Sequence, residues 1–122
     1  MFPVEDNEEF TFVGEIKRPV FRNRKGCFIE FVVNEVNNRR VRQDTLLVGL
    51  TNNQARLMSR FEEGDTFFVK AECASEEDSK EVNAINFAYL LDYKLLNRGY
   101  ENSENRFNNV VKDLSSGRFP RY

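Results

Sequence analysis

The chain has 122 residues, of which 40% are hydrophobic and 31% charged, with 12 Phe, no Trp and no His. This length and apolar content suit one domain with one core, and they argue against a second domain and against disorder throughout. A net charge of −2 argues against a uniformly basic nucleic-acid binder, and the absence of His excludes an imidazole base.

Targeting and membrane signals are not apparent. No apolar stretch approaches the roughly 20 residues of a membrane span, and the N-terminus is acidic rather than basic and then apolar. We therefore expect a cytoplasmic protein with no membrane partner. Cys27 and Cys73 are far apart, so each is expected to be a small buried residue in a reducing compartment. A disulfide is the alternative.

The first half of the chain has the period-two pattern of β-strands. Phe10–Ile16 alternates apolar and polar residues, and Pro19 ends this strand or places it at an edge. Cys27–Val36 is a second strand. The polar residues 37–40 read as a hairpin turn with a basic rim, and Val41–Leu50 follows as a third strand.

A short helix is expected after the third strand. Thr51 and Gln54 have the spacing of a capping box, in which each side chain satisfies a free backbone N–H at the helix start. Ala55, Met58 and Phe61 would form its apolar stripe.

The remaining elements are less sharply marked. Thr66–Ala74 is a fourth strand and Ser75–Lys80 a charged loop, after which a fifth strand runs from Val82 to about Leu96 with a bend near Ala84. Its far end, Ala88–Leu96, could instead be helical.

These elements divide the chain into three regions. Residues 1–9 form an acidic arm, residues 10–96 one domain, and residues 97–122 a polar, mostly flexible tail rich in Asn, Ser, Arg and Gly. Within the tail, Phe107–Leu114 is the one segment that could form a helix. The order of three strands, a helix and two strands is that of an OB-fold, so we expect an all-β, five-stranded Greek-key barrel.

Charge is strongly segregated along the chain. From Lys17 to Arg42 eight basic residues accompany two acids, whereas from Glu62 to Asp92 nine acids accompany two lysines. The basic residues flank an apolar strand on both sides, so they could converge into one cationic face that binds phosphates. Ordinary solvated loop charges are the alternative.

Three stretches together resemble a known family. These are Phe12–Ile16 followed by Pro19, Leu46–Gly49, and Phe61–Ala71. Their order and spacing resemble those of the bacterial and phage single-stranded DNA-binding proteins and the related primosomal replication proteins, over roughly residues 10 to 92. The resemblance implies an OB-fold that coats exposed single strands during replication or recombination, with homo-oligomers and replication proteins as partners and no cofactor.

The chain also departs from that family. Arg42 and Val48 stand where the family usually has aromatic residues, and the ending Ser116–Tyr122 lacks the usual acidic tip. A divergent phage or plasmid member, working in the host cytoplasm, therefore fits better than a housekeeping bacterial protein.

Single-strand binding needs cations for phosphates and flat groups for bases, and arginine supplies both. Phe28 and Phe68 occupy the alternate positions of their strands that we expect to face away from the core, and Phe21 follows the first strand. Core packing is the alternative for each Phe. The predicted nucleic-acid site contains seven basic and three aromatic residues: Lys17, Arg18, Arg22, Arg39, Arg40, Arg42 and Lys70, with Phe21, Phe28 and Phe68.

Catalysis has little support in the sequence. There is no paired-cysteine zinc motif and no glycine-rich phosphate loop, and the paired acids Glu62 and Glu63 read as a solvated loop rather than a metal site. We therefore predict a non-enzymatic, metal-free protein that binds single-stranded DNA, with RNA as a further candidate ligand. The rivals are an OB-fold adaptor whose basic face binds a protein, and a carboxylate-based metal-dependent hydrolase.

Overall fold

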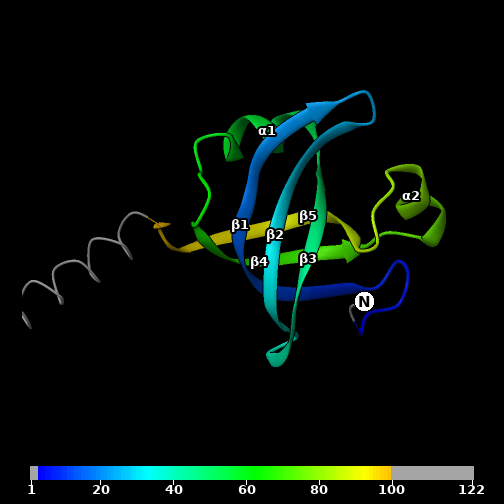
Figure 1. Cartoon of the computed structure of the whole chain (residues 1–122), viewed down its shortest axis with the longest axis horizontal. Helices are drawn as coiled ribbons and strands as arrows, with labels where there is room; N and C mark the ends of the chain where they lie inside the picture. The colour runs from blue at the N-terminus through cyan, green and yellow to red at the C-terminus, as the bar shows by residue number, and fades with distance from the viewer. Residues whose placement is uncertain (1–2, 100–122) are drawn as a thin grey trace, which may run out of the picture.

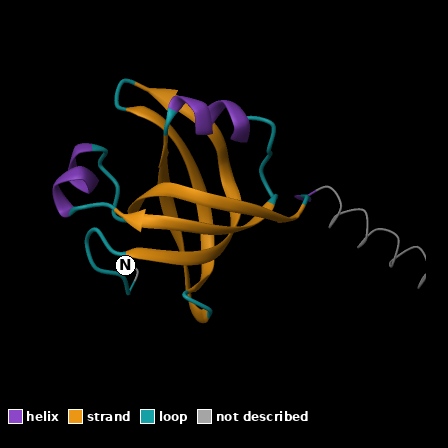
Figure 2. Ribbon diagram, turned by 180° about the vertical axis from the view of Figure 1, so that it is seen from behind, coloured by secondary structure: helices purple, strands orange, loops and turns teal. Residues whose placement is uncertain are grey.

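The computed structural model describes residues 3–99, and it shows five strands closed into a barrel in the order β1-β2-β3-β5-β4 (Figure 1). Both helices lie outside the barrel wall (Figure 2). The elements in chain order are β1 (Glu9–Asn23), β2 (Gly26–Val36), β3 (Arg39–Leu50), α1 (Asn52–Met58), β4 (Thr66–Cys73), α2 (Glu76–Glu81) and β5 (Phe87–Asn97). This is the predicted OB-fold arrangement, with a short helix between the third and fourth strands.

The first three strands form an antiparallel meander. The β2–β3 hairpin turns at Asn37 and Asn38, whose φ angles of 50° and 65° are left-handed, as a tight hairpin turn requires and Asn tolerates. The predicted turn is therefore confirmed. β1 is longer than expected, because it continues past Pro19 to Asn23 and pairs with β2 as far as its turn.

β5 closes the barrel between β3 and β4. It pairs in parallel with β3 from Leu47↔Phe87 to Gly49↔Tyr89, and antiparallel with β4 over most of its length. The helical alternative for Ala88–Leu96 is wrong, because Phe87–Asn97 is a strand that pairs with β3 and β4. Ala88 and Leu90 enter the core, and after a shift in the register Tyr93 and Leu95 pack against it.

The capping box of α1 is confirmed. The Gln54 backbone N–H donates to Thr51 Oγ1 at 3.1 Å, and the Thr51 N–H donates to Gln54 Oε1 at 2.9 Å. Ala55 and Met58 are buried as expected, and Gln54 Nε2 also donates to the Leu90 carbonyl at 3.0 Å. This last bond attaches the start of α1 to β5.

The segment between β4 and β5 differs from the prediction. Residues 76–81 form the helix α2 rather than a loop, with Ser75 Oγ accepting the Asp78 N–H at 3.2 Å. Glu76, Glu77 and Asp78 in the first turn stabilise this helix, because their negative charges lie at the positive end of the helix dipole. Residues 82–86 are not strand, since Asn83 has a φ of 56°, and β5 begins only at Phe87.

Two apolar clusters stabilise the domain. The larger fills the barrel and includes Phe12, Phe31 and Phe67, whose neighbouring rings meet edge to face 5.3 and 6.0 Å apart. The smaller lies on the outside of the wall, where Ala74 and Phe87 pack against Phe28. This second cluster positions the candidate site.

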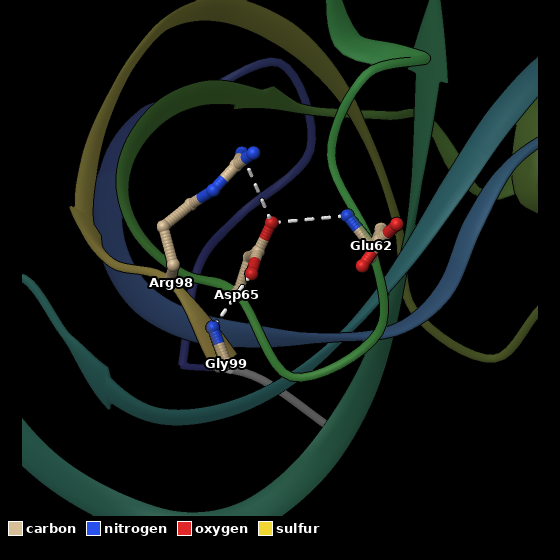
Figure 3. A network of polar contacts seen from close by, with 4 residues as sticks. All are labelled: Glu62, Asp65, Arg98 and Gly99. Carbon is tan, nitrogen blue, oxygen red and sulfur yellow. Dashed lines mark hydrogen bonds and ion pairs between the residues drawn. The ribbon is translucent and has the colours of Figure 1, made fainter. Parts of the chain in front are cut away.

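A buried carboxylate ties the loop before β4 to the end of β5 (Figure 3). Asp65 is 2% exposed and accepts the backbone N–H groups of Glu62 at 3.0 Å and Gly99 at 2.7 Å. Arg98 adds an ion pair at 3.4 Å. These hydrogen bonds and the ion pair offset the free-energy cost of burying the Asp65 carboxylate.

The N-terminal residues lie against the barrel. Val4 packs on the main core, and the Asn7 N–H donates to the Cys73 carbonyl at 2.8 Å. Both cysteines are free; Cys27 is buried as expected, whereas Cys73 is partly exposed and its burial raises the pKa of its thiol. Among residues 3–99, no helix has the length and apolar character needed to cross a membrane. The predicted tail from residue 100 lies outside the described residues.

Candidate nucleic-acid interface

The ten predicted site residues fall into three groups rather than one. Five lie on the half of the β1–β2 hairpin nearest its turn: Lys17, Arg18, Phe21, Arg22 and Phe28. Three lie at or near the β2–β3 turn: Arg39, Arg40 and Arg42. Two lie on the outer side of β4: Phe68 and Lys70.

The two arginine-rich groups do not converge. They lie at opposite ends of β2, up to about 30 Å apart at the usual rise per strand residue. The prediction of one cationic face around this strand is therefore wrong, because a strand separates the residues at its two ends instead of folding them together.

A row of four aromatic rings crosses the outer face of β1, β2 and β5. Ring centroids are 5.7 Å apart for Phe21 and Phe28, 6.0 Å for Phe28 and Phe87, and 5.0 Å for Phe87 and Tyr89. The row forms because Phe28 and Phe87 alternate with the buried core residues of their strands and so lie outside the barrel.

Gly49 makes room for this row. It lies on β3 between Phe28 and Tyr89 in the strand register. A Cβ added here would come within 3.2 Å of both the Phe87 and Tyr89 rings. The absence of a side chain therefore lets both rings lie close over β3.

The exposure of the row corrects one prediction. Phe28 is on the outer side, as its place in the strand alternation indicated, but it is only 3% exposed because it packs in a cluster with Phe21, Ala74 and Phe87. Almost none of its ring is therefore accessible to a base. The accessible members are the two ends, the half-buried Phe21 and Tyr89, which is 37% exposed.

Sequence reasoning missed Phe87 and Tyr89 as site residues. Their alternation with Ala88 and Leu90 in the predicted fifth strand was the available signal, but the helical alternative for Ala88–Leu96 left the side on which Tyr89 lies open. Arg24 and Lys25 contributed to the predicted basic segment and were also absent from the predicted site.

Cations line the β1–β2 hairpin beside the row. The Arg18 guanidinium lies 3.6 Å from the centre of the Phe21 ring, a cation–π contact. All five hairpin cations are exposed, and none forms an ion pair with another residue of the described range: Lys17, Arg18, Arg22, Arg24 and Lys25. Their charges are therefore available to a ligand.

A hollow of about 870 Å³ lies at the Tyr89 end of the row, between the β1–β2 turn, the start of α1 and α2. The turn contributes Arg24 and Lys25, and α2 contributes Asp78 and Glu81. The turn and α2 lie on the same side of the barrel in Figures 1 and 2. The hollow therefore has one cationic and one acidic wall.

Tyr89 is held by α2. Its hydroxyl donates to Asp78 Oδ2 at 2.6 Å. Burial, together with this carboxylate, raises the pKa of Tyr89 to about 12, so the hydroxyl remains protonated at neutral pH.

The β4 group lies on another face. Phe68 is partly exposed between Val13 of β1 and Lys94 of β5 in the strand register, whereas Tyr89 of the aromatic row lies opposite Glu72, further along β4. Lys70 is exposed and forms an ion pair with Glu9 at 3.3 Å. Among residues 3–99, no group of three or more His, Cys, Asp or Glu side chains could hold a metal ion.

No protein-family model and no curated protein matches the chain. Similar solved structures include two crystal forms of Rim1, a mitochondrial single-stranded DNA-binding protein from S. cerevisiae. Form 2 has a TM-score of 0.54 and 16% identity, and covers 78% of this chain and 99% of Rim1. Form 1 has a TM-score of 0.53 and 17% identity, and covers 77% of this chain and 100% of Rim1.

The shared feature is the OB-fold. At these identities the likeness supports the fold expected from the sequence motifs. Rim1 is mitochondrial, so the phage or plasmid origin expected for this chain stays a prediction.

Proposed function

We propose that this protein binds single-stranded DNA without regard to base order, on the outer face formed by β1, β2 and β5. One observation carries the proposal: a row of aromatic rings runs beside a hairpin edge with five exposed cations that form no ion pair within residues 3–99. The row and hairpin occupy the β2–β3 side of the barrel and its flanking loops, where OB-folds bind oligonucleotides.

The binding chemistry follows from the two kinds of group. The hairpin cations replace counterions along the phosphate backbone, which makes affinity depend on salt. Tyr89 and Phe21 offer ring surface to bases, and a stacked base contributes about 1–3 kcal/mol. Arg18 can serve both purposes, since its guanidinium already stacks on Phe21. These steps need neither a cofactor nor a chemical reaction.

The other predicted residues extend this face for longer strands. Arg39, Arg40 and Arg42 would contact phosphates beyond the hairpin, at the far end of β2. Phe68 and Lys70 would act where a strand passes around β1 onto β4. We propose that such a protein coats exposed strands during replication or recombination, together with replication proteins.

Self-association is part of the proposal. From Lys17 onward, β1 pairs with β2 alone among the described strands, so one edge of this segment is open to a second copy. Light scattering across the micromolar range should show a species larger than a monomer. A monomer at all concentrations would contradict self-association and leave the DNA proposal intact.

Fluorescence anisotropy with labelled oligo-dT, duplex DNA and RNA over a salt series tests the function. Single strands should bind more tightly than duplex. Arg22→Ala with Arg24→Ala should weaken binding and reduce the log–log salt slope by about 1.4, or about 0.7 per lost phosphate contact. No binding at low salt by folded protein would refute the proposal.

A charge-matched control separates local contacts from net charge. Arg56 and Arg60 are exposed cations outside the hairpin, so the double alanine variant should bind almost as the parent does. Replacing Arg39 and Arg40 should weaken binding of long oligonucleotides more than of short ones. Loss of a protein partner with unchanged DNA binding in the hairpin variant would favour the adaptor alternative.

A further inference from the structure

The two walls of the hollow at Tyr89 differ in charge, and this sets how a bound strand can lie. Arg24 and Lys25 on the β1–β2 turn attract phosphates, whereas Asp78 and Glu81 on α2 repel them. A strand lying between these walls is therefore expected to turn its backbone toward the turn and its base edges toward α2.

The α2 wall offers hydrogen-bond acceptors. Asp78 Oδ2 accepts the Tyr89 hydroxyl, and Oδ1 has no partner among the described residues. The Glu81 carboxylate likewise forms no ion pair or side-chain hydrogen bond within that range. An ionised carboxylate only accepts hydrogen bonds.

The other polar side chains beside α2 in the hollow, Gln54 and Tyr89, already form hydrogen bonds within the protein. The Gln54 amide donates to the Leu90 carbonyl and accepts from the Thr51 N–H. The Tyr89 hydroxyl proton is directed to Asp78. A base edge beside α2 therefore meets unused acceptors and few donors.

We propose that the hollow selects bases that carry an exocyclic amino group, with Asp78 and Glu81 as the specificity-determining residues. Cytosine, adenine and guanine present such an amino donor, and acidic side chains accept from cytosine N4 in known recognition. Thymine and uracil present two carbonyl oxygens around one N–H, and those oxygens are repelled by a carboxylate. The preference concerns base type rather than base order and rests on the proposed function.

Competition anisotropy with unlabelled oligo-dC and oligo-dT of equal length tests this preference. Both are pyrimidine strands that differ in the group at C4, in the N3 acceptor or donor beside it, and in the C5 methyl group of thymine, so the α2 variants below assign the preference. Oligo-dC should compete about fivefold more strongly, as expected for one charge-assisted hydrogen bond in a partly exposed site. Equal competition, or stronger competition by oligo-dT, overturns the inference. Binding of neither oligonucleotide would instead refute the proposed function.

Variants test the assignment to α2. Asp78→Asn keeps an oxygen for the Tyr89 hydroxyl and adds an amide donor that suits thymine O4, so the dC to dT ratio should fall to one or below. Glu81→Gln should lower the ratio as well. Glu77→Gln is the control, because it removes the same charge from α2 at an exposed position that does not line the hollow.

The control should strengthen binding of both strands by the same factor and leave their ratio unchanged. Melting temperatures of all variants check folding. If Asp78→Asn is unstable, the comparison of Glu81→Gln with Glu77→Gln decides the matter. A ratio that stays at its parent value in the Glu81 variant and in a folded Asp78 variant contradicts the assignment.

Discussion

The buried carboxylate of Asp65 accepts the backbone N–H of Gly99 at 2.7 Å, which joins the loop before β4 to the residues just beyond β5. The approach is close, since a Cβ at Gly99 would lie 2.9 Å from the backbone carbon of Gly64. Arg98 and Gly99 therefore belong to the folded domain, although the sequence placed them in the tail.

Two truncations test where the domain ends. Deleting residues 100–122 should change the free energy of unfolding little, because all partners of Asp65 remain. Deleting residues 98–122 leaves a buried charge without Arg98 and Gly99 and should cost about 1–3 kcal/mol. Urea denaturation measures both. Equal stability of the two truncated proteins would show that this bond contributes nothing.

Adjacent phenylalanines on β4 should behave differently. Phe67 is fully buried, so Phe67→Ala should lower the free energy of unfolding by about 3–5 kcal/mol. Phe68→Ala removes a partly exposed ring and should cost much less, while weakening oligonucleotide binding with an unchanged salt slope. Unfolding of the Phe68 variant would place that ring in the core and reject it as a stacking residue.

Gly49→Ala tests the aromatic row without altering charge. The new Cβ would lie 3.2 Å from the Phe87 and Tyr89 rings, so these rings must shift away from β3. We expect a loss of about 1–3 kcal/mol in stability from overpacking and weaker binding at all salt concentrations. Parent-like binding and stability together would show that the rings adapt without consequence. Ala55→Gly, in α1, provides a destabilised control outside the row.

Alkaline pH should reveal the hydrogen bond between Tyr89 and Asp78. The pKa of Tyr89 is raised from 10.0 to about 12 in the folded protein, chiefly by burial. Its contribution to stability is therefore present below pH 10 and is lost as the pH rises toward 12. The difference in urea midpoint between the parent and Tyr89→Phe should shrink over this range. A constant difference would mean that Tyr89 titrates normally.

Strands and helix caps could be predicted from the sequence where they depend only on residues that are close together in the chain. Alternation in Cys27–Val36 and the Thr51–Gln54 capping box depend on residues a few positions apart, and both are present in the fold. Helix α2 was missed because it has six residues and no buried face, so no apolar periodicity marks it.

The candidate site depended on long-range contacts, and sequence alone did not provide them. The exposure of Phe28 is decided by Phe87, which lies 59 positions later in the chain. Likewise, the cations at the two ends of β2 could be grouped only after the strand length was known. The alternation of residues along β2 correctly placed Phe28 on the outer side of the barrel wall, but it could not show which residues cover Phe28 there.

The parallel seam between β3 and β5 has a kinetic consequence. Its register spans Leu47↔Phe87 to Gly49↔Tyr89, and it joins segments about 40 positions apart, whereas the β1–β2 and β2–β3 pairs close through short turns. Contacts distant along the chain require the larger loss of loop entropy, so the meander should assemble before β5 pairs with β3 and before β1 pairs with β4, whose register joins Glu9 to Glu72. Tyr89 reaches the hairpin side of the barrel only through this seam. A nascent chain that has formed the meander alone therefore carries the hairpin cations but lacks Phe87 and Tyr89, so the proposed binding surface is complete only after β5 has paired.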